Sequence, residues 1–196
     1  MAKVAIIGAG ISGLLAAKSC IEVGLVPVVF ERKNNVGGVW HSTQGYIWDS
    51  MTTNVSKYQH QLSELPWSAT DPIFPHHSVI LKYIEEYYKI YNFDKHILFN
   101  TKVIKAEKVE QENKQFPKGN IQYHNLTTNN KKCEIFDFLI IASGLNSNAI
   151  YPNIPQLKNF RGDIIHSIEY KEPRKYKNKN VLVIGGALVQ RKYHVK

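Results

Sequence analysis

The pattern of apolar and polar positions in the first 31 residues predicts a strand, a helix and a second strand. Residues 3–7 and 26–30 are short apolar runs of the length that buried strands have. Residues 12–23 carry apolar side chains at helical spacing, and Gly24 is a natural stop for such a helix. The chain therefore begins with a complete β-turn-α-β unit, which indicates an α/β fold.

A second helix and further strands are expected beyond this unit. Residues 40–75 are irregular and dense in polar and aromatic side chains, so we expect loops and short helices over a ligand there. Residues 78–91 place apolar side chains on one helical face, with Ser78 as the expected N-cap. Strands are also expected at residues 97–110, 120–126 and 133–136.

Two later apolar runs complete the pattern. Residues 138–142 are almost wholly apolar, which predicts a strand in the middle of a parallel sheet that is covered on both faces. Residues 181–184 predict another buried strand, and a glycine pair follows it. The chain therefore shows a second strand-glycine start after the first one at Gly8.

Composition narrows the class of protein. The net charge is +9, but the lysines are scattered and are densest near the end, so we expect a solvated surface or an anionic cofactor and no nucleic-acid partner. No apolar run approaches the roughly 20 residues of a membrane span, and no leader pattern precedes the first strand. The two cysteines, Cys20 and Cys133, form no C-x-x-C pair. A cytoplasmic protein without a metal site is the expectation.

Residues 8–13 read G-A-G-I-S-G, which is the glycine spacing of a dinucleotide-binding loop between a strand and a helix. The first glycine would make a tight turn, the second would let the backbone approach a pyrophosphate, and the third would allow close helix–strand packing. These are Gly8, Gly10 and Gly13. Ser12 lies at the helix start, where free N–H groups and the positive dipole end favour phosphate. Glu31 ends the second strand and would accept hydrogen bonds from a ribose, so the site favours FAD or NAD over NADP.

Further stretches resemble a known family. Residues 31–40 read E-R-x(4)-G-G-x-W, which resembles the continuation of the FAD site in two-dinucleotide-binding flavoproteins. Residues 140–144, I-I-A-S-G, resemble their second FAD signature, with serine where threonine is common. The decisive stretch is FRGDIIHSIEY at residues 160–170, because it matches the F-x-G-x-x-x-H-x-x-x-Y motif of flavin-containing monooxygenases. Baeyer–Villiger monooxygenases usually end a similar motif in Trp, where this chain has Tyr170.

The resemblance implies an architecture for the whole chain. A Rossmann-like FAD-binding domain of the two-dinucleotide-binding type would cover residues 1–155, with a β-rich insertion at about residues 97–136. A linker that carries the motif would cover residues 156–180, and residues 181–196 would be the incomplete start of an NADP-binding Rossmann unit.

The resemblance also implies a reaction and its residues. NADPH would reduce FAD, and the reduced flavin would capture O₂ as a C4a-hydroperoxide that oxygenates an amine nitrogen or sulfide sulfur of a small-molecule substrate. Asn54 lies in a T-N segment that resembles the family's and would be the catalytic residue beside the flavin's reactive edge. His166 would shape the junction between FAD and NADP rather than transfer protons. The other implied cofactor contacts are Arg32, Gly38, Val39, Trp40, Val103, Ser143, Gly144 and Gly185.

The second glycine loop departs from the family pattern, V-x-V-x-G-x-G-x-S-[AG]. Gly185 matches its first glycine, but Ala187 replaces the second and Gln190 occupies the third position. The added side chains would obstruct a pyrophosphate and crowd the helix–strand contact. Two interpretations stay open. The sequence is a monooxygenase truncated or misread after about residue 186, or it is a non-catalytic FAD-binding remnant without a working NADP site.

Overall fold

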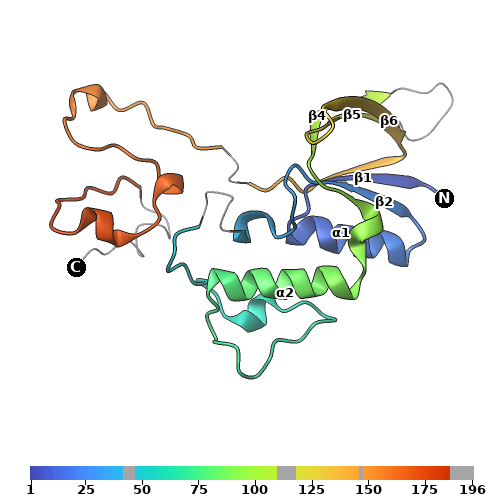
Figure 1. Cartoon of the computed structure of the whole chain (residues 1–196), viewed down its shortest axis with the longest axis horizontal. Coiled ribbons are helices and arrows are strands. Elements are labelled where there is room, and N and C mark those ends of the chain that lie inside the picture. Colours follow the sequence, from blue (N-terminus) through green and yellow to red (C-terminus); the bar gives the residue numbers. More distant parts are fainter. Residues whose placement is uncertain (42–46, 110–117, 146–147, 186–196) are drawn as a thin grey trace.

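A parallel sheet forms the centre of the computed structural model, which describes residues 1–41, 47–109, 118–145 and 148–185. Its strand order is β3-β2-β1-β7 (Figure 1). These strands are β1 (Lys3–Ile7), β2 (Val26–Phe30), β3 (Ile97–Leu98) and β7 (Phe138–Ile141). In the register of the sheet, Ile7 of β1 lies opposite Phe30 of β2 and opposite Ile141 of β7. The predicted α/β fold is confirmed.

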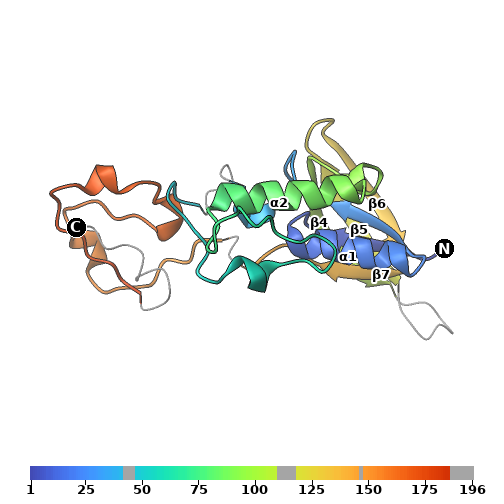
Figure 2. The same cartoon turned by 90° about the horizontal axis from the view of Figure 1, so that it is seen from below.

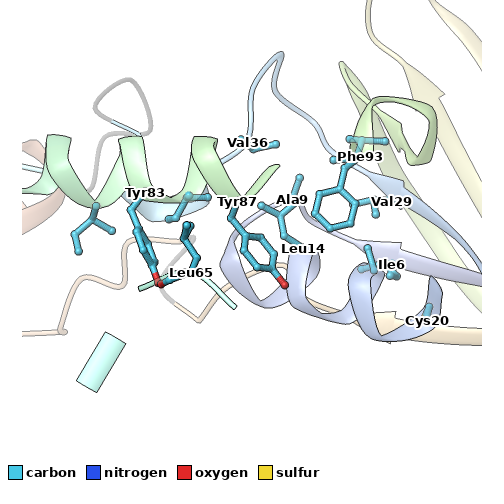
Figure 3. Packing of buried hydrophobic residues seen from close by; sticks show 14 of the residues in the cluster. Ile6, Ala9, Leu14, Cys20, Val29, Val36, Leu65, Tyr83, Tyr87 and Phe93 are labelled. Atoms are coloured by element: carbon cyan, nitrogen blue, oxygen red, sulfur yellow. The ribbon is translucent and has the colours of Figure 1, made fainter. Parts of the chain in front are cut away.

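Two helices are layered on one face of the parallel sheet. They are α1 (Ile11–Glu22) and α2 (His77–Ile90); α1 packs on β1 and β2, and α2 lies farther from the sheet in Figure 1 and beside α1 in Figure 2. Ile6 of β1 and Leu14 of α1 belong to one buried apolar cluster with residues of α2. Figure 3 shows Tyr83 and Tyr87 projecting from α2 into this cluster. Each helix lies within one residue of its predicted bounds.

A three-stranded antiparallel sheet lies on the opposite face. Its strands, in order, are β4 (Thr101–Val109), β5 (Lys118–Asn125) and β6 (Asn130–Phe136). Phe30 of β2 packs against this sheet, with its ring centroid 4.9 Å from that of Tyr123 and 5.8 Å from that of Phe136. The parallel sheet is therefore buried between helices and a second sheet, which is why β1 and β2 can be so apolar.

Short 3-10 turns make up much of the remaining ordered structure. They are η1 (Gly38–Trp40), η3 (Lys57–His60), η4 (Phe93–His96), η5 (Leu157–Asn159), η6 (Ser167–Glu169) and η7 (Pro173–Tyr176). The last three lie in residues 148–185, here called the arm, which extends away from the layered body in both views (Figures 1 and 2). In the described parts of the chain, no helix is both long enough and apolar enough to span a membrane.

The N-cap of α2 corrects the sequence prediction. The cap is His76 and not Ser78, because the His76 side chain accepts a hydrogen bond from the Ser78 backbone N–H at 3.4 Å. A ring nitrogen that lacks a proton can cap a helix as a hydroxyl oxygen does, but sequence rules favour serine.

The strand predicted at residues 97–110 is also corrected. The chain leaves the parallel sheet after β3 and joins the antiparallel sheet at β4, with Asn100 between them in the left-handed region at φ 50°. Asparagine tolerates this conformation better than most residues, so it permits the change of direction.

The environment of β7 is a further correction. β7 is an edge strand and not a central one, because β1 is its neighbour on one side and no described strand pairs with it on the other. Ile141 is 71% exposed and Phe138 is 48% exposed. The apolar run predicted the strand but not its burial.

The predicted strand at residues 181–184 does not form. These residues have no strand conformation, and Leu182 is 84% exposed. A strand requires a hydrogen-bonded neighbour, and none of the described strands lies beside this segment.

Candidate dinucleotide-binding site

Two of the three loop glycines are required by the protein's own packing. A Cβ atom on Gly13 would lie 1.9 Å from the Gly8 carbonyl oxygen, so no side chain fits between the helix and the turn. Gly8 has φ +106°, and a Cβ there would lie 2.5 Å from the Ala142 carbonyl oxygen. The turn between β1 and α1 is therefore held against the end of β7, as the glycine spacing predicts.

Gly10 is different, because neither its conformation nor its neighbours require glycine. Its φ of −73° and ψ of −179° are open to any residue, and an added Cβ would lie 3.7 Å from Gly38 Cα, an ordinary contact. Gly10 is the N-cap of α1 and offers no side-chain cap, and the first turn of α1 carries no acidic residue. The absent side chain leaves an uncapped helix N-terminus accessible, which is the arrangement that binds phosphate.

A second glycine turn lies against the first. The Gly37 N–H donates to the Ala9 carbonyl at 3.1 Å, and Gly38 at φ +56° lies so close to Gly10 that a Cβ on it would be 3.1 Å from Gly10 Cα. The E-R-x(4)-G-G-x-W stretch is thereby brought to the G-A-G-I-S-G loop. The two glycine segments lie side by side at the N-terminus of α1, and this pair of turns is here called the cradle.

Glu31 connects the end of β2 to this cradle. It is 8% exposed, and its carboxylate accepts hydrogen bonds from the Ala9 N–H at 2.8 Å and the Lys33 N–H at 2.9 Å. A carboxylate oxygen has more than one acceptor position, so these bonds leave capacity for a ribose hydroxyl. Contact with a ribose stays a prediction.

Of the other predicted contacts, Val103 lies apart from the rest. Ser12, Arg32, Val39 and Ser143 are exposed near the cradle or at the end of β7, and Trp40 is partly buried with its ring centroid 6.4 Å from that of His60. Gly144 follows at φ +83° with open space around it. Val103 is not beside the loop, because it lies in β4 and packs against the cluster between the two sheets. Its contact with a cofactor stays a prediction.

Asn54 lies on a segment that packs against the start of α2. Its neighbour Thr53 is 4% exposed and donates its N–H to Pro75 O at 2.9 Å, while its hydroxyl donates to Val55 O at 2.8 Å. Asn54 itself is exposed. The backbone on both sides is held, so the side chain is presented outward on a fixed support.

His166 and Gly185 lie in the arm, away from the cradle (Figure 1). His166 caps η6, because its Nδ1 accepts from the Ile168 N–H at 3.2 Å and its own N–H donates to Glu169 at 3.1 Å. The ring of Phe160 covers Gly162, where a Cβ would lie 2.6 Å from the ring. The motif residues therefore support one another locally. Residues 186, 187 and 190 lie outside the described residues.

Three residues that bind or belong to the segment around Asn54 were not predicted. Lys57 is 2% exposed, and its ammonium donates to Ser68 O and Asp71 O, each at 2.7 Å. His76 places its Nε2 2.8 Å from Asp49 O, and burial lowers the pKa of the adjacent His77. Lys171 donates to Ile47 O at 2.9 Å. No local pattern distinguishes these side chains from surface ones, because their partners include backbone carbonyls that only the folded chain brings near.

An α/β domain with this loop and this acidic residue defines a dinucleotide-binding protein of the Rossmann type. The chain belongs to the flavin-binding monooxygenase-like family, whose sequence model matches residues 1–189. It is 40% identical over 195 residues to flavin-containing monooxygenase 3 of Oryctolagus cuniculus, covering 93% of this chain and 35% of that protein. It is 35% identical over 196 residues to flavin-containing monooxygenase 2 of Homo sapiens, with the same coverage of 93% and 35%. The chain thus spans about a third of the length of these relatives.

Solved structures show the same fold. S-allyl-L-cysteine S-oxygenase from Allium sativum matches with a TM-score of 0.79 at 22% identity, covering 89% of this chain and 44% of that one. Tmm from Pelagibacter sp. strain HTCC7211 matches with a TM-score of 0.76 at 25% identity, covering 89% of this chain and 43% of that one. A steroid monooxygenase bound to NADP matches with a TM-score of 0.60 at 25% identity, covering 86% and 31%.

Proposed function

We propose that this chain binds FAD at the cradle that the two glycine turns form at the N-terminus of α1, as the flavin-binding part of a monooxygenase. The observation that carries the proposal is Gly10, whose missing side chain serves no need of the fold and leaves the N-terminus of α1 accessible. The first-turn N–H groups would bind the diphosphate, and the Glu31 carboxylate would accept from the ribose. An acidic group at that place disfavours a 2′-phosphate, which supports FAD at this site and leaves NADPH to a separate one.

For the whole protein we propose NADPH- and O₂-dependent oxygenation of a soft nucleophile, either an amine nitrogen or a sulfide sulfur. The flavin supplies the redox and oxygen chemistry when it is bound. The residues of this chain bind and orient it, and Asn54 is proposed to present its amide at the reactive edge. Family membership supports this proposal, as does the name of the S-allyl-L-cysteine S-oxygenase that shares the fold.

The Gly10→Ala variant tests the cradle without disturbing the fold. Because alanine fits both the conformation and the space at position 10, the variant should keep the unfolding free energy within about 0.5 kcal/mol. FAD affinity, measured by quenching of flavin fluorescence, should fall at least tenfold. Gly119→Ala in β5, where an added Cβ has open space, is the matched control and should bind FAD like the unmodified chain. A Gly10→Ala variant that binds FAD as tightly as the unmodified chain would refute the proposal.

A second candidate is flavin binding without turnover. Residues 181–185, where an NADP-binding unit would start, form no strand in the described structure, and Gly185 has no neighbouring atom within 4 Å of an added Cβ. Rapid bleaching of bound FAD by NADPH under anaerobic conditions would favour the monooxygenase. A flavin that binds but stays oxidised would favour the second candidate for the 196-residue chain.

A further inference from the structure

Asn54 belongs to a segment that is fixed along its length by backbone hydrogen bonds. Residues 47–57, here called the strap, run beside the residues that lead into α2. The bonds on this side join His77 N to Met51 O at 2.9 Å, Thr53 N to Pro75 O at 2.9 Å and Lys57 N to Ile73 O at 2.7 Å. Asn54 therefore lies between two anchored positions.

The arm holds the same strap through Lys171. The Lys171 carbonyl accepts from the Asp49 N–H at 2.9 Å, and the Lys171 ammonium donates to Ile47 O, also at 2.9 Å. Ile47 is 3% exposed, so the ammonium satisfies a carbonyl at a buried residue. Two bonds of one residue thus hold Ile47, which is 124 residues earlier in the chain, and Asp49.

Asp49 continues the connection into the body. Its carbonyl accepts from His76, the N-cap of α2, while its N–H is bound by the arm. The Nε2–H tautomer of His76 suits this bond, because it leaves Nδ1 free to accept from the Ser78 N–H. Asp49 therefore links the arm to α2: its N–H binds the arm, and its carbonyl binds the N-cap of α2.

The sequence position of Lys171 gives this linkage its significance. It directly follows Tyr170, the last residue of the F-x-G-x-x-x-H-x-x-x-Y stretch. Tyr170 is itself packed, with its ring stacked on Tyr176 at a centroid distance of 5.8 Å. The end of the motif is thus ordered where Lys171 meets the strap.

We propose that Lys171 is a positioning residue that joins the motif-bearing arm to the strap and thereby fixes the place of Asn54. This inference rests on the proposed function, in which Asn54 faces the flavin. The motif then acts at the flavin site through backbone carbonyls of the strap, with no need for His166 to touch a reacting atom. Loss of the Lys171 ammonium would leave the Ile47 carbonyl without its charged donor and loosen the strap.

Hydrogen exchange in the 196-residue chain without flavin tests the linkage directly. In Lys171→Met, which keeps the unbranched side chain up to Cε but has no donor, amides of the strap should exchange about tenfold faster. Lys171→Arg retains a donor and should restore slow exchange. Lys175→Met removes an exposed lysine of the same arm and is the control, with no change expected. Unchanged exchange at Asp49 to Asn54 in Lys171→Met, or the same change in Lys175→Met, would overturn the inference.

A second measurement separates this inference from the proposed function. With FAD bound, Lys171→Met and Asn54→Ala should alter the visible circular dichroism of the flavin in the same way. The double variant should add nothing to either single one if Lys171 acts through Asn54. A chain that fails to bind FAD refutes the proposed function, while the exchange rates still decide whether Lys171 holds the strap. Additive spectral effects would show that Lys171 does not act through Asn54.

Discussion

The chain contains two strand-glycine starts with similar sequences and different structures. Residues 3–8 read KVAIIG and residues 181–186 read VLVIGG. The first is β1, with strands on both sides, and Val4, Ala5 and Ile6 are at most 1% exposed. Residues 181–185 are not a strand, and Val181, Leu182 and Ile184 are 46%, 84% and 62% exposed.

The difference shows what the first strand and glycine turn of a Rossmann unit require besides their own sequence. The position of Gly8 is constrained by its neighbours, because its N–H donates to Phe30 O of β2 and its α-carbon faces Ala142 after β7. Gly185 also has positive φ, at +138°, but in the described part of the chain no atom lies within 4 Å of a Cβ built on it. The glycine turn acquires its packing constraints from the neighbouring strands and the helix that follows, so these parts are what a functional second site would need.

Alanine at the two glycine loops gives the largest expected contrast. Gly13→Ala should lower the unfolding free energy by about 3 kcal/mol, because a Cβ 1.9 Å from a backbone oxygen forces the turn and α1 apart. Gly185→Ala should cost less than about 1 kcal/mol, since the exposed chain around it can readjust. Urea unfolding followed by circular dichroism measures both. Equal losses would mean that the second start is packed in solution after all.

The contrast also explains which parts of the structure were predictable from sequence. The β-turn-α-β unit and the roles of Gly8 and Gly13 follow from spacing, because every partner lies within about 30 residues or is a parallel neighbour that the fold class supplies. The burial of β7 and the strand at residues 181–184 were mispredicted for one reason. An apolar run indicates that a segment favours burial, but it does not show whether another element is present to bury it.

The support around Asn54 was unpredictable for a different reason. His76 replaces the expected Ser78 as cap, Lys57 binds the carbonyls of Ser68 and Asp71, and Lys171 binds a carbonyl 124 residues earlier. Such bonds depend on side chains reaching backbone oxygens whose positions only the tertiary structure defines. A basic residue that acts this way looks like any surface lysine in the sequence.

Glu31→Gln tests the hydrogen bonds that connect the end of β2 to the first glycine loop. Glutamine has one oxygen and one amide nitrogen, so the Ala9 and Lys33 N–H groups cannot both keep an acceptor. The variant should lose about 2 kcal/mol of unfolding free energy. Glu86→Gln on the exposed side of α2 should change it by less than about 0.5 kcal/mol. If the two variants unfold alike in urea, the Glu31 bonds do not stabilise the loop.

Two tyrosines of α2 test how side-chain hydroxyl groups affect the stability of the layered body. The Tyr83 hydroxyl accepts from the Leu62 N–H at 2.8 Å and donates to Leu65 O, so Tyr83→Phe should cost about 1.5 kcal/mol. The Tyr87 hydroxyl is buried and has no hydrogen-bond partner within the described ranges. Tyr87→Phe should therefore be neutral or stabilise by up to about 1 kcal/mol. A larger loss for Tyr87→Phe than for Tyr83→Phe in thermal unfolding would reverse this assignment.

Tyr87 also predicts that the free energy of unfolding depends on pH in the alkaline range. Burial raises the pKa of Tyr87 from 10.0 to about 12, so the unfolded chain releases this proton at lower pH than the folded one. Stability linked to Tyr87 is therefore full below pH 10 and is lost as the pH rises from 10 toward 12. Tyr87→Phe removes this contribution, so its urea midpoint should fall less steeply over that range. Equal slopes for the variant and the unmodified chain would contradict the assignment.

The smallest expected effect on folding comes from the exposed edge of the first unit. Ile141 of β7 is 71% exposed on a strand whose second edge pairs with no described strand, and such an edge can template pairing with another molecule. Ile141→Lys should leave the unfolding free energy within about 0.5 kcal/mol. It should also reduce concentration-dependent association in sedimentation velocity, because a charge on an edge strand opposes strand pairing. Leu182→Lys is the counterpart in the second start, where the apolar side chain is 84% exposed but lies on no strand. If Leu182→Lys reduces association as much as Ile141→Lys does, the association follows from apolar exposure alone and not from the open sheet edge.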